Sequence, residues 1–341
     1  MVSNKALIFI GFSVVLSMLV FSGYQYVFES NILVGKQDRR ICIPEGMDFP
    51  ELLANFKKED IVHEPLSFAF LSKIMKYQEK IKPGCYLLKA NMSNVEAIRL
   101  LRSGNQLQEK ITFSNARFIT DLAGELTKNT KGDSTKMAEM LTNPAVAQKY
   151  GFTKETFISM FIPNTYYVYW SNDENAVLDR MKKEYTKFWT EKRKAKAKAL
   201  NLSQTEVATV ASIVMNESLS KTEQPKVAGL YLNRIKKGMR LEADPTIKFA
   251  LGDFSIKRVL YEHLQIDSPY NTYKKAGLPP GPISLPNATV LDAVLNYEKH
   301  NYLFMCSIGD GSEIHNFSVD FEGHKKNIDI YAKNLKSRDK R

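Results

Sequence analysis

Two helix-start signals lie close together in the C-terminal half of the chain and constrain its fold more than any other feature. Ser203 and Glu206 stand three positions apart, and so do Ser220 and Glu223. At this spacing the two side chains of each pair bond backbone N–H groups at the N-terminus of a helix. Gly238 then suits the residue just after the second helix, where a left-handed backbone is favoured. The sequence therefore predicts two consecutive helices joined by a short turn.

One acidic residue lies on the apolar face of the first of these helices. Glu217 follows Val207, Val210 and Val214 at offsets of ten, seven and three residues, so the four side chains share one face. Burial and the negative end of the helix dipole both raise the pKa of a carboxyl group placed there. A glutamic acid that is protonated near neutral pH can protonate the leaving oxygen of a glycosidic bond. The alternative is a solvated glutamate without a chemical role.

A long uncharged segment lies near the N-terminus. Residues 6–28 contain no charged side chain, and Lys5 precedes them. This length meets the roughly 20 apolar residues that a membrane-crossing helix needs. No small-residue cleavage site is present, so we expect an uncleaved transmembrane anchor and not a signal peptide. Residues 1–5 would then lie in the cytoplasm, and the chain after Glu29 would lie on the outer side of the cell membrane.

The charge of the chain admits several partners. A net charge of +11 suits nucleic acid, acidic lipid or an anionic wall polymer. The densest basic run, residues 192–199, continues a helical pattern that begins near Val177, so a solvated helix end explains it. Export by the predicted anchor argues against nucleic acid as the partner.

The three cysteines give no metal-binding pattern. Cys42, Cys85 and Cys306 form no CxxC pair, so the usual spacing of zinc ligands is missing. We expect no metal and no cofactor. An odd number of cysteines leaves at least one thiol free. Cys42 and Cys85 both fall on predicted strands of one small domain, and whether they pair stays open.

The remaining pattern predicts an α+β protein with several parts. Residues 38–127 show three passes of strand, turn and helix, which together predict a small βα module. The predicted strands are 40–44, 84–88 and 110–113, and the predicted helices are 49–56, 95–102 and 118–126. Residues 128–201 are mostly helical and connect this module to a mixed helical and β domain at 202–335. Near its end, strands at 302–307 and 314–317 predict a hairpin.

Several blocks of the sequence resemble a known family. The segments ASIVMNES, VAGLYLNRIKKGMRLEADPT, YNTYKKAGLPPGPISLPN and IHNF are similar, in order and spacing, to the signature blocks of the endolytic murein transglycosylase (YceG-like) family. The resemblance implies that residues 202–335 form the catalytic domain with Glu217 as the acid. It also implies that residues 38–127 form a LysM-like module that contacts N-acetylated glycan strands, and that the chain cooperates with peptidoglycan synthases.

The chain departs from the family pattern at two places. Glu242 stands where the family usually has Gln, and its negative charge is expected to raise the pKa of Glu217 further. Met215 and Asn216 stand where the family often has Glu-Lys. Asp244 precedes Pro245, which predicts a turn and not a helix at this point.

A loop rich in proline and glycine supplies further candidate residues. Asn271, Thr272 and Tyr273 offer amide and hydroxyl groups that suit the acetamido and hydroxyl groups of amino sugars. Alternatively, these groups satisfy the backbone of their own loop. His315 and Phe317 match the H-x-F pair of the family. His315 would orient a sugar hydroxyl or a water, or it is a structural histidine.

The sequence thus predicts a membrane-anchored, single-pass lytic transglycosylase that acts on peptidoglycan. Its proposed substrate contacts are Glu242, Asp244, Asn271, Thr272, Tyr273, His315 and Phe317. One rival is a conventional glycoside hydrolase, which needs a second carboxylate such as Glu242 or Asp244. The other is a non-catalytic protein that binds the wall as a scaffold. The sequence leaves open the preferred glycan length, the need for stem peptides and the oligomeric state.

Overall fold

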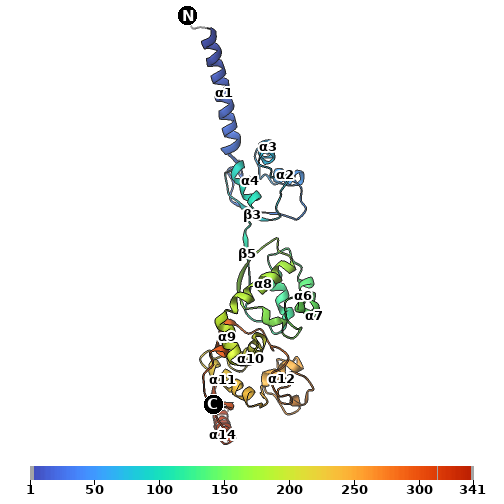
Figure 1. Ribbon diagram of the computed structural model, residues 1–341, viewed down its shortest axis with the longest axis vertical. Coiled ribbons are helices and arrows are strands. Elements are labelled where there is room, and N and C mark those ends of the chain that lie inside the picture. The colour runs from blue at the N-terminus through green and yellow to red at the C-terminus, as the bar shows by residue number, and fades with distance from the viewer. Residues whose placement is uncertain (1–3, 313, 339–341) are drawn as a thin grey trace. The chain divides into compact units, whose positions relative to one another are not determined.

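The computed structural model describes residues 4–312 and 314–338, which form two compact units (Figure 1). Unit 1 holds the chain up to Lys110 together with residues 129–131 and 167–173, and unit 2 holds the remainder. The class is mixed: many helices are combined with small sheets, each of two strands. This confirms the expected α+β class. The finer boundaries that the sequence predicts at residues 127 and 201 stay predictions.

Unit 1 combines one long helix with a small βα body. Its elements are α1 (Asn4–Phe28), β1 (Ser30–Ile32), β2 (Arg39–Ile43), α2 (Phe49–Lys58), α3 (Pro65–Ile74), β3 (Gly84–Leu88), β4 (Met92–Ser93) and α4 (Asn94–Ser103). Strands β2 and β3 pair in antiparallel fashion, as do β1 and β4. Side chains such as Ile43, Phe68 and Tyr86 are buried between the strands and helices. The capping box at Ser93 and Glu96 and the left-handed Gly104 bound α4 as such signals predict.

A disulfide joins the two strands of the larger sheet in unit 1. Cys42 lies directly opposite Cys85 in the antiparallel register, with 4.0 Å between their Cα atoms. Opposed residues in such a ladder are close enough for their sulfur atoms to bond. The pairing that the sequence left open is therefore present. Cys306 is a free thiol.

Helix α1 covers the uncharged segment near the N-terminus. Its large apolar side chains from Phe9 onward are mostly exposed, among them Phe12 and Phe21. Within the described part of the chain, no helix is long and apolar enough to cross a membrane. The predicted transmembrane span is therefore not supported by the fold.

Unit 2 is built from many helices and a C-terminal hairpin. Its helices are η1 (Ile119–Leu122), α5 (Ala123–Thr127), α6 (Ser134–Thr142), α7 (Pro144–Lys149), η2 (Phe157–Met160), α8 (Glu174–Phe188), α9 (Glu191–Ala199), α10 (Gln204–Glu217), α11 (Gln224–Lys236), α12 (Asp244–Leu251), η3 (His263–Gln265), α13 (Ala288–Leu295) and α14 (Phe321–Arg338). The hairpin consists of β7 (Phe304–Ser307) and β8 (His315–Ser318). Strands β5 (Gln108–Phe113) and β6 (Asn164–Tyr169) pair with each other, and along each of them the chain passes from one unit to the other.

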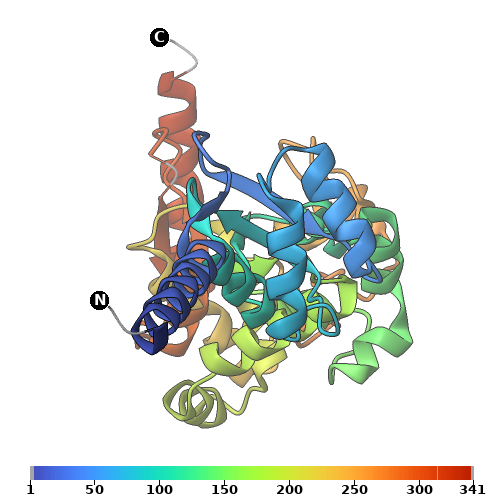
Figure 2. The same cartoon turned by 90° about the horizontal axis from the view of Figure 1, so that it is seen from above.

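Helix α10 is the central element of unit 2. It packs against α11, α12 and α13, and every residue from Val207 to Val214 is buried. The helix is thus enclosed on all sides, not only along the predicted stripe of valines. Helix α14, drawn in red in Figure 2, packs on β7 and β8, and Asn334 near its end donates a hydrogen bond to the carbonyl oxygen of Ile308 in the hairpin.

The predicted helix boundaries in unit 2 are partly confirmed. The box of Ser203 and Glu206 caps α10 with both reciprocal bonds, and Gly238 is left-handed after α11. The box of Ser220 and Glu223 is wrong, because α11 begins at Gln224 and no side chain caps it. The carboxylate of Glu223 has other partners, described below.

Two further expectations need correction. The segment after Asp244 forms helix α12, because proline is tolerated in the first turn of a helix, where its missing N–H costs no bond. The basic run at 192–199 does not continue α8. It lies in a separate helix, α9, which begins where the side chain of Thr190 accepts a bond from the backbone N–H of Arg193.

Candidate active site

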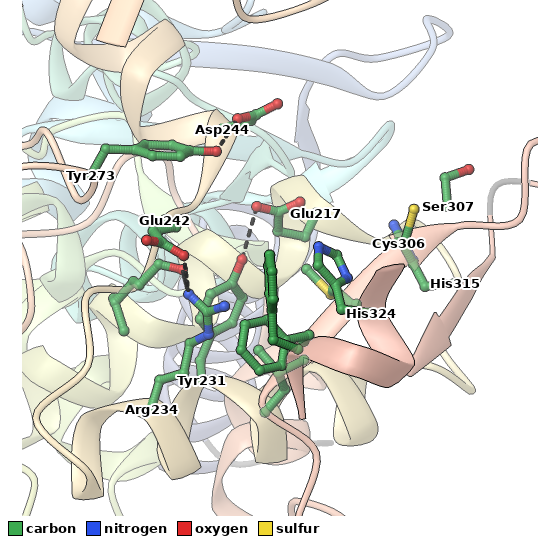
Figure 3. Close-up of a pocket in the computed structure, with 15 residues that line it drawn as sticks. Glu217, Tyr231, Arg234, Glu242, Asp244, Tyr273, Cys306, Ser307, His315 and His324 are labelled. Atoms are coloured by element: carbon green, nitrogen blue, oxygen red, sulfur yellow. Dashed lines mark hydrogen bonds and ion pairs between the residues drawn. The ribbon is translucent and has the colours of Figure 1, made fainter. Parts of the chain in front are cut away.

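A pocket of about 370 Å³ in unit 2 gathers most of the titratable side chains that the sequence singled out (Figure 3). It lies at the ends of α10 and α12, along α11, and against the hairpin and α14. Its lining comprises Glu217, Leu230, Tyr231, Arg234, Leu241, Glu242, Asp244, Tyr273, Phe304, Met305, Cys306, Ser307, His315, Phe321 and His324. Three carboxylates and two histidines therefore share one hollow.

Glu217 is the last residue of α10, and its side chain is partly exposed in the pocket. Tyr231 Oη, on α11, donates a hydrogen bond of 2.9 Å to Glu217 Oε1. Burial of the carboxyl group raises the pKa of Glu217 to about 7. The Tyr231 bond and the charge of Lys248 lower that pKa, whereas the charge of Asp244 raises it. A large fraction of Glu217 is therefore protonated at neutral pH, as a proton donor requires.

Tyr231 is a site residue that the sequence reasoning did not single out. Its side chain is buried, and burial followed by the charge of Glu217 raises the pKa of Tyr231 well above its usual range. The phenol therefore keeps its proton and remains a donor to Glu217. Its position within α11 is that of an ordinary core tyrosine, and only its hydrogen bond to Glu217 shows that it belongs to the site.

A second pair of a tyrosine and a carboxylate, Tyr273 and Asp244, also lines the pocket. Tyr273 Oη donates a hydrogen bond of 2.6 Å to Asp244 Oδ1 at the start of α12. Burial and this bond raise the pKa of Tyr273. The pair joins the proline-rich loop to α12, and both groups face the same hollow as Glu217 (Figure 3).

Glu242 is held by an arginine. Arg234 Nη1 lies 2.9 Å from Glu242 Oε2, and it also donates to the carbonyl oxygens of Arg240 and Leu241. Arg234 Nε donates to the carbonyl oxygen of Leu303. Because this guanidinium is almost fully buried and multiply bonded, it clamps α11 to the segment around residue 241.

The expected influence of Glu242 on the acid is wrong. Asp244 is the carboxylate whose charge raises the pKa of Glu217, and Glu242 does not contribute. The charge of Glu242 acts instead on its neighbours Tyr273 and His324, where it favours the protonated form.

Two of the three predicted loop residues do not reach the pocket. Asn271 is fully buried, and its amide donates to the carbonyl oxygens of Leu264 and Ile266. Thr272 Oγ1 accepts a bond from the N–H of Ala243. These side chains brace their own loop and the start of α12, which is the alternative that the sequence left open. Of the three, the structure brings only Tyr273 to the pocket of Glu217.

The H-x-F pair is divided between two environments. His315 lines the pocket, and its Nδ1 lies 2.9 Å from Glu223 Oε2. Phe317 is not among the lining residues and packs against Tyr302, with 5.6 Å between the ring centroids. The structure thus places His315, but not Phe317, beside the other candidate residues.

His324 is a further lining residue that sequence reasoning missed. It lies on α14, a helix that was not predicted, and its ring stacks on Phe304 with 5.3 Å between centroids. Burial and the charge of Arg234 lower the pKa of His324, so the ring is neutral at neutral pH. Within the described residues no cluster of three or more potential metal ligands occurs.

Comparison with known sequences and structures identifies the family of this chain. A sequence model of the YceG-like family matches residues 41–330, and the chain therefore belongs to this family. A crystal structure of a YceG-like protein from Listeria monocytogenes shares the fold, with a TM-score of 0.52 at 22% identity over 85% of this chain and 99% of that one.

Curated relatives carry a more specific name. The chain is 28% identical to the endolytic murein transglycosylase of Bacillus subtilis (strain 168), over 85% of this chain and 84% of that protein. It is 26% identical to the endolytic murein transglycosylase of Streptococcus pneumoniae serotype 2 (strain D39 / NCTC 7466), over 94% of this chain. The match spans 64% of the length of that pneumococcal protein.

Proposed function

We propose that this chain is a lytic transglycosylase, a lyase that cleaves the β-1,4 bond between N-acetylmuramic acid and N-acetylglucosamine in peptidoglycan. The observation that carries the proposal is Glu217, a carboxyl group with a pKa of about 7 in the pocket of a YceG-like chain. The names of the relatives support murein as the substrate.

The mechanism requires one carboxyl group that acts twice. Glu217 first gives its proton to the glycosidic oxygen as the bond from that oxygen to C1 breaks. The carboxylate then removes the proton of the C6 hydroxyl of the same muramoyl residue, and O6 bonds to C1. The product carries a 1,6-anhydro ring, and Glu217 regains its proton. Because the nucleophile belongs to the substrate, water does not enter the product.

The pocket offers groups for both steps. Tyr231 holds Oε1 of Glu217 in place, and its bond favours the ionised form that the second step requires. Asp244 favours the protonated form that the first step requires. We assign Tyr273, His315, Glu242 and Asp244 as the side chains that contact sugar hydroxyl and acetamido groups, since all four line the pocket.

The direct test replaces Glu217 by Gln. We expect Glu217→Gln to lower the release of anhydro-ended fragments from purified sacculi on the order of 10²-fold or more, as removal of a general acid does. Mass spectrometry of the products gives the readout. Glu262→Gln is the matched control, because Glu262 is 76% exposed and lies outside the pocket. Full activity of Glu217→Gln would refute the assignment.

A conventional hydrolase is the second candidate, favoured by one observation. Asp244 lies in the same pocket as Glu217, as a second carboxylate would in a hydrolase. Digestion in water labelled with ¹⁸O separates the two reactions. A hydrolase places the label at a reducing end, whereas the proposed reaction yields unlabelled anhydro ends.

The role of unit 1 is a further part of the proposal. We infer that it contacts glycan strands as a LysM-like module, supported by its small βα body of helices and antiparallel strands. Sedimentation of Glu217→Gln with sacculi measures binding without turnover. If the unsubstituted chain also binds and yields no products, the chain is a scaffold and the enzymatic proposal fails.

We also propose attachment to the cell membrane, with the active site on the outer side, where it ends nascent glycan strands beside their synthases. The support is the uncharged segment 6–28, whose large side chains from Phe9 onward are mostly exposed on α1. Alkaline extraction of membranes tests it: the chain should stay with the lipid, and Leu16→Lys combined with Val20→Lys should release it.

A further inference from the structure

We propose that Glu223 is a positioning residue: it fixes the proton of the His315 ring on Nδ1, so that Nε2 serves as the acceptor for a donor group of the bound glycan. The inference rests on the proposed function, because the ligand is the one that occupies the pocket of Glu217. The sequence suggested a different task for Glu223, the capping of α11, which the fold does not support.

Both oxygen atoms of Glu223 are engaged. Oε1 accepts the backbone N–H of His315 at 2.8 Å, and Oε2 lies 2.9 Å from His315 Nδ1. Oε2 also accepts the hydroxyl proton of Ser218 at 2.8 Å. The exposed side-chain fraction is only 9% for Glu223 and 14% for His315. The carboxylate is thus shielded from water and bound to the histidine at two points.

The surrounding donors indicate where the proton lies. A backbone N–H can only donate, and the Ser218 hydroxyl is itself an acceptor for the N–H of Ser220, so its proton is directed to Glu223. The Glu223 carboxylate thus acts as an acceptor toward its other partners, and the bond between Oε2 and Nδ1 is completed when the ring donates its proton. The neutral ring is therefore protonated on Nδ1 and carries its lone pair on Nε2.

This tautomer defines what the ring can bind. His315 lines the pocket together with Glu217, and no described residue bonds its Nε2. A lone pair accepts hydrogen bonds from hydroxyl or amide N–H groups. The glycan offers both, as sugar hydroxyls and acetamido groups. The opposite tautomer would present a donor and would select carbonyl oxygens instead.

Glu223 also links two walls of the pocket. Ser218 directly follows the acid at the end of α10, whereas His315 begins β8 of the hairpin. One carboxylate bonds both, so it fixes the ring of His315 relative to the residue next to Glu217. The hydrogen bond that one ring nitrogen of a histidine makes determines which of the two nitrogens carries the proton.

The first test measures the tautomer without any need for turnover. In ¹⁵N NMR spectra of the full chain at pH 8, the His315 signals should show a protonated Nδ1 and an unprotonated Nε2. The spectrum of His315→Asn identifies the signals by their loss. A proton on Nε2 would overturn the proposal. Because this readout does not depend on activity, its failure is distinct from failure of the proposed function.

The second test uses two substitutions that keep different halves of the ring. The amide of His315→Asn matches the position of Nδ1 and retains the bond to Glu223. The amide of His315→Gln reaches the position of Nε2. We expect His315→Gln to retain more turnover of sacculi than His315→Asn. If His315→Asn instead retained more turnover than His315→Gln, the bond between residue 315 and Glu223 would be enough for activity. The role of His315 would then be structural, and the proposal would be overturned.

A double substitution tests whether Glu223 acts through His315. Glu223→Gln alone should lower kcat about tenfold, the order of a coupling between two residues in contact. Combined with His315→Ala, it should cause no further loss, because the two residues act as a unit. Glu262→Gln, beside His263 at 3.9 Å, is the matched control and should keep full activity. If the loss of kcat in the double variant equals the product of the losses in the two single variants, the proposal is overturned. If Glu223→Gln does not fold, the NMR measurement decides.

Discussion

The phenol of Tyr231 donates a hydrogen bond of 2.9 Å to Glu217 Oε1, and this bond joins α11 to the end of α10. It stabilises the ionised acid, whereas burial and the charge of Asp244 stabilise the protonated acid. The pKa of about 7 is the balance of these opposing effects, and two of the neighbours can be removed separately.

Tyr231→Phe removes the bond that lowers the pKa of Glu217. The pKa should therefore rise, and the alkaline limb of the pH profile of kcat should move to higher pH, because the acid stays protonated longer. The measurement is the rate of anhydro-end release across the neutral range, on both sides of the pKa of Glu217. Tyr261→Phe is the control, since Tyr261 is 80% exposed and lies outside the pocket. A shift to lower pH would contradict this account.

Asp244→Asn should move the same limb in the opposite direction. The charge of Asp244 raises the pKa of Glu217, so its removal lowers that pKa. Asparagine keeps an oxygen that accepts the bond from Tyr273 Oη. The same assay applies, with Asp267→Asn at an exposed position as control. If both pocket variants shift the limb alike, the opposing roles of Tyr231 and Asp244 are wrong.

Glu217→Gln should change how stability depends on pH. The folded-state pKa of Glu217, about 7, lies above its ordinary value of 4.5. The protonated form is thus favoured on folding, and this stability is present below pH 4.5 and lost as pH rises through 7. Relative to the unsubstituted chain, Glu217→Gln should gain about 3 kcal/mol between about pH 4 and pH 8, at 1.36 kcal/mol per pKa unit.

Calorimetric unfolding of both proteins at the two pH values gives the difference. At the acidic value the two proteins serve as each other's reference, because the protonated carboxyl group of Glu217 and the glutamine amide that replaces it are both neutral. An equal response of the two proteins to pH would mean that Glu217 is solvated in the folded state.

Removal of the disulfide should destabilise unit 1. The bond between Cys42 and Cys85 closes a loop with a sequence separation of 43. Loop-closure entropy for this length corresponds to about 4 kcal/mol of stabilisation. Denaturant unfolding of the Cys42→Ala, Cys85→Ala double variant measures the loss. Cys306→Ala, whose thiol is free and lies in unit 2, should leave the unit 1 transition in place.

Gly229→Ala should destabilise unit 2. A Cβ atom at Gly229 would lie 2.5 Å from the carbonyl oxygen of Glu298 and 2.7 Å from His300 Nε2. Overpacking of this kind costs about 1–3 kcal/mol, and the gain of alanine over glycine within a helix offsets roughly 1 kcal/mol of it, which leaves a net loss of up to about 2 kcal/mol. Thermal unfolding gives the readout. Gly124→Ala is the control, because nothing lies within 4 Å of the corresponding position.

The sequence predicts local features of the site well. The capping box at Ser203 and the spacing to Glu217 depend on neighbours within a few residues, and α10 has the predicted start. The hairpin of β7 and β8 was also predicted, because strand patterns flank a turn rich in glycine. Such signals depend only on neighbours in the sequence, so they can be recognised without knowledge of the tertiary packing.

Partners that are distant in the chain could not be predicted. Arg234 looks like an ordinary helix residue, yet its neighbours include the carbonyl oxygen of Leu303. Glu223 matches a capping box in sequence, but its carboxylate bonds His315 instead. His324 gives no signal before α14 is known to lie against the hairpin. In each case, tertiary packing determines the partner of a side chain whose local pattern suggests another role.

Helix α10 has eight consecutive buried residues before Glu217, whereas α14 has none among its described residues. The two walls of the pocket therefore differ in packing: α10 is surrounded by other helices, whereas α14 rests on the hairpin and leaves the rest of its surface open to solvent. A ligand held against α10 would meet side chains fixed by the core, whereas a ligand held against α14 would meet side chains that solvent still contacts.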